Sequence, residues 1–181
     1  MKKIVLFISI VFIAMQGEAQ FSKASLQASG LTCAMCSNAI YKALAVLPFV
    51  SEVKPDIKNS IFNITFKDNE AFSIDALQAA VEGAGFSVAK LQLTGQFNNI
   101  PIKNDQHTKI DGQVFHFVDV NDQQLSGEKT ITIVDKKYVT NKDFKKFSNK
   151  TTMECFQTGL ASSCCKIDGI VANTRIFHVT L

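Results

Sequence analysis

The chain has 181 residues, enough for one domain or two small ones, and its 15 Phe residues supply the apolar bulk that a core needs. Its 19 Lys and Arg residues slightly outnumber its 16 Asp and Glu residues, giving a formal net charge of +3. This weak charge, with no basic patch interleaved with aromatic residues, argues against a nucleic-acid partner.

The first 19 residues are typical of an export signal. Lys2 and Lys3 precede an apolar stretch from Ile4 to Met15, and small residues lead up to Ala19. The stretch is short for a membrane-spanning helix, which needs about 20 residues. We therefore expect cleavage after Ala19, a periplasmic or secreted protein, and no stable membrane insertion once the signal is removed. Retention of the segment as an N-terminal anchor is the alternative.

The next part of the chain alternates between strand and helix periodicity. The expected elements are a strand at 24–29, a helix that Pro48 stops, strands at 50–54 and 62–66, a helix with Ser73 as its N-cap, and a strand at 86–93. This order predicts a ferredoxin-like βαββαβ domain over residues 22–94, with an antiparallel sheet and both helices on one of its faces.

From Gly95 onward the pattern changes to short strands separated by polar turns. We expect strands at 97–103, 112–120, 129–134 and 175–181, polar turns at 104–107, 121–124 and 126–128, and a short helix around 141–147. These elements predict a smaller β-rich domain over residues 95–181, with an OB-like barrel as one candidate. The fold class predicted for the whole chain is α+β.

A CxxC pair, Cys33 and Cys36, lies between the first strand and the first helix. The helix dipole and the free N–H groups of the first turn favour thiolate over thiol at this position. Two thiolates suit a soft cation of low coordination number, Cu(I) in the first place and Hg(II) next, whereas Zn(II) needs further ligands. An exposed site with few ligands can pass its ion on by ligand exchange.

Two other interpretations of the CxxC pair remain open. Thioredoxin-like oxidoreductases also place a CxxC between a strand and a helix, but here no Trp precedes the pair and no Pro lies inside it. The second alternative is a permanent disulfide in an interaction protein that binds no metal. We find no motif for group transfer or hydrolysis, so we do not expect an enzyme.

Three segments together resemble the heavy-metal-associated domain family. They are the loop Gly30-Leu31-Thr32-Cys33-Ala34-Met35-Cys36, the helix end at Leu47-Pro48, and the run Val81-Glu82-Gly83-Ala84-Gly85-Phe86. The family includes copper chaperones, metal-binding domains of copper and zinc transport ATPases, and periplasmic mercury-binding proteins. The resemblance covers about residues 22–93 and departs from the family at Leu31, commonly Met, and at Phe86, which is Lys in eukaryotic-type copper chaperones.

The resemblance implies that Cys33 and Cys36 are the metal ligands and that Gly30 and Thr32 shape the loop. It also implies a metal-transport or metal-accepting protein as partner. Phe86 is expected to shield the loop or to be an ordinary core aromatic, and Met35 is not expected to bind the ion. We thus expect an exported soft-metal-binding protein, a metallochaperone or a scavenger, in which Lys42 is a solvated side chain or steers an acidic partner.

A second group of cysteines lies near the C-terminus: Cys155, Cys164 and Cys165. One interpretation is a disulfide from Cys155 to Cys164 or Cys165 with a spare thiol, because five cysteines cannot all pair within one chain. The other is a second site for Cu(I) or Zn(II), in which His116 and His178 are candidate further ligands. His107 is expected to be solvated, in the turn at 104–107.

Overall fold

The computed structural model describes residues 20–31 and 34–181, so the predicted export signal and Cys33 lie outside the described residues. Its strands form one mixed sheet in the order β2-β3-β1-β4-β7-β8-β6-β5. The strands are β1 (Gln20–Ser29), β2 (Val50–Asp56), β3 (Ile61–Phe66), β4 (Ser87–Ile102), β5 (Gln106–Ile110), β6 (Gln113–Phe117), β7 (Gln123–Ile133) and β8 (Ile176–Thr180). The helices are α2 (Ala34–Ala45), α3 (Ile74–Gly83), α4 (Asn141–Ser148), α5 (Cys155–Thr158) and the 3-10 helix η2 (Ser163–Asp168). Within the described ranges, no helix is long and apolar enough to cross a membrane.

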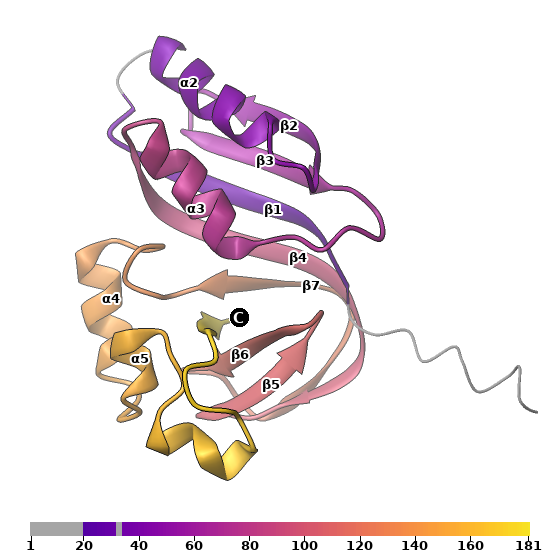
Figure 1. Ribbon diagram of the computed structural model, residues 1–181, viewed down its shortest axis with the longest axis vertical. Coiled ribbons are helices and arrows are strands. Elements are labelled where there is room, and N and C mark those ends of the chain that lie inside the picture. Colours follow the sequence, from indigo (N-terminus) through magenta and orange to yellow (C-terminus); the bar gives the residue numbers. More distant parts are fainter. Residues whose placement is uncertain (1–19, 32–33) are drawn as a thin grey trace, which may run out of the picture.

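The N-terminal half has the predicted ferredoxin-like arrangement. The strands β2, β3, β1 and β4 pair antiparallel in that order. Figure 1 shows α2 and α3 side by side on one face of these strands. The inward side chains Ile40 and Leu44 of α2 and Leu77 of α3 are fully buried, because their spacing puts them on one side of each helix. Ser73 caps α3, as expected, by accepting a hydrogen bond from the Ala76 N–H at 3.1 Å.

The strand β4 runs through the position at which we placed the domain boundary. Two separate strands were expected on either side of Gly95, but one strand continues from Ser87 to Ile102. Gly95 lies within it because β1 passes very close: a Cβ at this position would lie 2.5 Å from the carbonyl oxygen of Gln20. The glycine therefore marks a close backbone approach within a sheet rather than a linker.

The C-terminal half extends the same sheet, and the OB-like barrel is not confirmed. Strand β7 pairs with β4, and β8 then joins β7 antiparallel and β6 parallel. Three expected turns are wrong in whole or in part. Residues 104–105 form a turn but 106–107 belong to β5, residues 123–124 begin β7, and residues 126–128 lie within β7. Polar residues on an exposed part of a strand resemble a turn in sequence, which explains the error at 126–128. The expected short helix is confirmed as α4, with Thr140 as its N-cap.

A single hydrophobic core reaches from one half into the other. The ring of Phe21, on β1, lies 5.7 Å from the rings of Phe72 and Phe97 and 5.5 Å from that of Phe115 on β6, centroid to centroid. Edge-to-face and tilted contacts of this kind are favourable beyond the apolar area they bury. Phe21 therefore packs the start of the ferredoxin-like half against the β-rich half.

Arg175 joins the two halves by polar contacts. Its guanidinium donates two hydrogen bonds to the carboxylate of Asp75 on α3, both at 3.1 Å, and one to Asp135, also at 3.1 Å. The same group lies 4.1 Å from the centroid of the Phe177 ring, and the Tyr138 hydroxyl donates to Asp75 at 2.5 Å. This fork geometry is specific to arginine, so the contact fixes the orientation of α3 relative to β8.

Candidate metal centres

The CxxC loop lies at the end of the molecule where β1 leads into α2. Gly30 ends the strand with φ +81°, a conformation that side chains other than glycine rarely adopt, and Cys36 lies in the first turn of α2. Cys36 is half-buried, while Cys33 and Thr32 lie outside the described residues. Cys36 therefore belongs to the first turn of a helix, where the N–H groups have no helical partner, and no acidic residue stands in that turn.

Two apolar side chains pack between the core and the residues that follow β1. Leu31 and Phe86 are partly buried and pack against the main core. The Cδ1 atom of Phe86 lies 3.9 Å from the position that a Cβ of residue 30 would take. Phe86 therefore contacts the loop and the core together, which combines the two roles expected for it.

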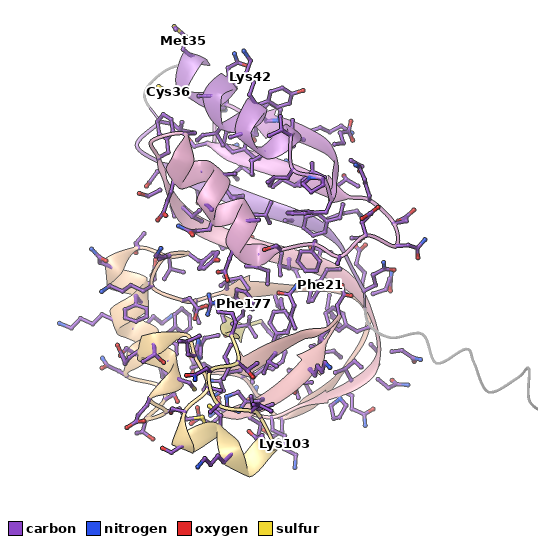
Figure 2. The ribbon with its side chains drawn as sticks, in the orientation of Figure 1. Phe21, Met35, Cys36, Lys42, Lys103 and Phe177 are labelled. Carbon is purple, nitrogen blue, oxygen red and sulfur yellow. The ribbon has the colours of Figure 1, made fainter. Side chains whose placement is uncertain are left out.

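Met35 and Lys42 are exposed side chains of α2. Met35 is 83% exposed, and Figure 2 shows its side chain pointing out from the end of α2. Lys42 lies in the last turn of α2, is exposed, and projects on a different side of the helix from Cys36 (Figure 2). Both side chains are thus directed toward solvent.

The second group of cysteines is brought together in the C-terminal half. Cys155 begins α5, and Cys164 and Cys165 lie on η2. The three sulfurs all lie within 4.8 Å of one another, and those of Cys164 and Cys165 are 3.5 Å apart. Cys155 and Cys165 are fully buried, and none of the three forms a disulfide. The thiols for which the sequence left both a disulfide and a metal site open therefore form a compact, unbonded cluster, which we call the C-terminal thiol cluster.

The three thiols of this cluster differ in how readily they ionise. Burial raises the pKa of the Cys155 thiol well above its usual range, and the nearby Cys165 raises it further. Burial likewise raises the pKa of Cys165. Burial also opposes ionisation of Cys164, but hydrogen bonds, first that of the Ser162 hydroxyl at 3.2 Å, outweigh it and lower the pKa of Cys164 to about 7. Cys164 is therefore the thiol that ionises first.

The expectation that His107 is solvated is wrong. Its side chain is fully buried, because residues 106–110 form a strand that packs His107 against the C-terminal thiol cluster. Its ring Nδ1 lies 2.6 Å from the carboxylate of Asp168, and its Nε2 lies 3.8 Å from the sulfur of Cys155. The pairing of β5 with β6 sets His107 directly opposite His116, at a distance of 4.8 Å between ring centroids.

The two histidines that the sequence favoured have other partners. His178 is held by Asp135, whose carboxylate lies 2.5 Å from its Nδ1. His116 lies 3.2 Å from Asp105 through its Nε2, and burial, followed by the nearby His178 and His107, lowers its pKa to about 3. His107, His116 and Cys155 also lie within 4.8 Å of one another, whereas His178 joins no such group among the described residues. His107 and Asp168 are the site residues that sequence reasoning missed.

Comparison with known families and structures bears on the N-terminal half. The family model described as "Heavy-metal-associated domain" matches residues 25–87. Similar solved structures include oxidized MerP from Ralstonia metallidurans CH34, with 29% identity, TM-score 0.34, and coverage of 39% of this chain and 96% of that one. A copper form of CopA from Bacillus subtilis, in its S46V variant, has 28% identity, TM-score 0.33, and coverage of 41% and 93%.

A CopZ metallochaperone has 22% identity and TM-score 0.35, with coverage of 38% of this chain and 100% of that one. No curated protein matches the chain. The family match lies within the ferredoxin-like half, and the C-terminal thiol cluster lies outside it. Residues 25–87, and not the chain as a whole, thus match the heavy-metal-associated domain.

Proposed function

We propose that this protein is an exported carrier or scavenger of a soft metal ion, Cu(I) in the first place, bound by the thiolates of Cys33 and Cys36. The observation that carries the proposal is the match of residues 25–87 to a heavy-metal-associated domain, together with the position of Cys36 in the first turn of α2. Hg(II) fits the same two-thiolate site, whereas Zn(II) fits it less well because it needs more ligands.

The position of the loop supports transfer of the ion to another protein. The first turn of α2, which holds Cys36, lies at one end of the molecule (Figure 2), and Met35 within it is 83% exposed. An acceptor with its own thiolates can reach a metal there and take it by stepwise ligand exchange. We therefore propose a metal-transport or metal-accepting protein as the partner.

A site-resolved titration tests this proposal. The protein is produced with its complete leader, and the mass of the exported product shows whether residues 1–19 have been removed. Reduced protein is then loaded with one equivalent of Cu(I), and thiol alkylation is measured for each cysteine by peptide mass spectrometry. We expect Cu(I) to protect Cys33 and Cys36, and the Cys33→Ser, Cys36→Ser double variant to lose at least about 100-fold in affinity at the loop.

Met35→Leu is the matched control, since it changes the loop without removing a sulfur that binds the ion; it should keep the affinity of the unaltered protein. Alkylation of Cys33 and Cys36 unaffected by Cu(I) would overturn the proposal. Catalytic turnover of a dithiol or disulfide substrate, in place of metal protection, would indicate the oxidoreductase alternative.

A further inference from the structure

The C-terminal thiol cluster has the donor atoms of a closed metal site. Cys155, Cys164 and Cys165 place three sulfurs within 4.8 Å of one another, and the Nε2 of His107 lies 3.8 Å from the sulfur of Cys155. A tetrahedral ion with metal–sulfur bonds of about 2.3 Å holds its sulfur ligands about 3.8 Å apart. The three sulfurs thus stand close to the spacing that a shared ion requires. His107 is grouped within 4.8 Å with Cys155 and His116 and not with all three sulfurs, so its ring must move toward Cys164 and Cys165 to share that ion.

A carboxylate lies at one ring nitrogen of His107, as is usual for histidines that bind a metal through the other ring nitrogen. Asp168 lies 2.6 Å from the ring Nδ1 of His107 and also accepts a hydrogen bond from its backbone N–H at 3.2 Å. With the proton on Nδ1 donated to Asp168, Nε2 carries the lone pair, and this atom faces the sulfur of Cys155. A carboxylate bonded to the far nitrogen of a histidine fixes its tautomer and raises its basicity toward a metal.

The surroundings of the cluster are apolar and largely closed to water. Cys155 and Cys165 are fully buried, and Val114, Ala161 and Ile176 pack around them. Within the described part of the chain the cluster lies in the C-terminal half, whereas the heavy-metal-associated domain ends at residue 87. The two sets of thiols thus lie in separate parts of the chain.

We propose that Cys155, Cys164, Cys165 and His107 form a second, enclosed binding site for a d10 metal ion, with Zn(II) as its ion. Three thiolates and one imidazole are a common ligand set of structural Zn(II), and four protein ligands leave no open position. Each thiol releases its proton to the solvent as the metal binds. This site holds η2 and α5 against β5, whereas the two-thiolate loop exchanges its ion.

The experiment uses the full chain with Cys33→Ser and Cys36→Ser, so that the CxxC loop cannot contribute and a failure of the proposed function leaves the result unaffected. The reduced protein is titrated with Zn(II) against a chromophoric chelator, and Co(II) serves as a spectroscopic probe. We expect one equivalent of Zn(II) to bind. Bound Co(II) should show thiolate-to-metal charge-transfer absorption and the visible bands of tetrahedral coordination.

Two variants locate the site. Cys164→Ser removes the sulfur that is only partly buried and should lower Zn(II) affinity by about 10-fold to 100-fold or more. Ser163→Ala, an exposed neighbour on the same 3-10 helix, is the matched control and should leave the affinity unchanged. Because a variant can fail to fold, alkylation is also measured on the otherwise unaltered chain, where Zn(II) should protect Cys155, Cys164 and Cys165 together.

Three results would overturn the second site. They are a titration with no bound equivalent, Zn(II) affinity that Cys164→Ser leaves unchanged, and a disulfide between two of the three cysteines that persists in the reduced protein. Cu(I) binding here with no measurable Zn(II) binding would also overturn the assignment of the ion.

Discussion

The two halves of this protein hold their cysteines in opposite settings. In the ferredoxin-like half, Cys36 is half-buried at the start of α2, at one end of the molecule. In the β-rich half, Cys155 and Cys165 are fully buried, and a histidine held by a carboxylate faces Cys155. Few ligands at a surface favour exchange of an ion, whereas several ligands in an apolar enclosure favour its retention. Sulfur donors alone therefore do not define the behaviour of a metal site, because their number and burial determine whether the ion is exchanged or retained.

The largest expected effect tests whether the two halves fold as one unit. Phe21→Ala removes the ring that contacts Phe72, Phe97 and Phe115, and should cost about 3 to 5 kcal/mol of unfolding free energy. The only two tyrosines report on different halves, Tyr41 from α2 and Tyr138 from the region after β7. Chemical denaturation followed by tyrosine fluorescence in Tyr41→Phe and Tyr138→Phe backgrounds should give coincident transitions, both shifted by Phe21→Ala.

Phe147→Ala, at a half-buried position of α4 outside the main core, is the control and should cost clearly less. Separate transitions for the two tyrosines would contradict this expectation, because each half would then unfold as an independent domain.

The next effect concerns the polar contacts of Arg175 with Asp75 and Asp135, which join the two halves. Arg175→Ala leaves Asp75 and Asp135 without their shared cation and should lower the unfolding free energy by about 3 kcal/mol. Arg175→Lys should restore only part of this loss, because an ammonium group cannot donate the fork of hydrogen bonds. Lys23→Ala breaks the exposed pair with Glu128 and should change stability by less than about 1 kcal/mol. Equal losses for Arg175→Ala and Lys23→Ala in denaturant titrations would contradict this assignment.

A smaller effect sharpens the contrast between the two metal centres. Asp168→Asn keeps the size of the side chain but removes the charge that orients His107, and should weaken Zn(II) binding at the C-terminal thiol cluster by about 10-fold. Cu(I) binding at Cys33 and Cys36 should not change, since Asp168 lies in the other half. Chelator competition for both ions on the same preparation measures the two affinities, and equal weakening at both sites would show that the variant acts through the fold.

The smallest effect is a dependence of stability on pH that arises from the Asp75 carboxylate, which contacts Arg175. Burial opposes ionisation of Asp75, but the hydrogen bonds from Arg175 and Tyr138 outweigh it and hold the pKa of Asp75 below 3.8. A lowered carboxyl pKa stabilises the fold above its unfolded value and loses that effect as the pH falls through its folded value. The cost of Asp75→Asn, about 1 kcal/mol at neutral pH, should therefore be constant above roughly pH 5 and shrink below roughly pH 4. Unfolding free energies measured across this range test the sign, and a cost that grows toward acid would contradict it.

The parts of the fold with regular periodicity could be predicted from the sequence. In the ferredoxin-like half, the helices are specified by local signals, namely the apolar spacing of Ile40 and Leu44 and the capping residue Ser73. The continuity of β4 at Gly95 could not be predicted, because a glycine between two strands and a glycine inside one strand, where its paired neighbour approaches closely, look alike in sequence. His107 was missed for a related reason: its burial comes from Asp168, 61 residues later, and from strand pairing that no local pattern reveals.

The continuity of β4 has a consequence for how other proteins can approach the heavy-metal-associated domain. A ferredoxin-like sheet standing alone would end at β4 and leave its N–H and C=O groups ready to pair with a strand of another molecule. Here β7 pairs with β4 from Leu91 onward, which closes much of that edge to strand addition. The opposite edge is β2, where Pro55 lacks an N–H donor and the charged side chains of Glu52 and Lys54 are exposed. Both outer strands of the domain are therefore poor templates for pairing, which leaves its helical surface as the docking face for the metal-accepting partner that we propose.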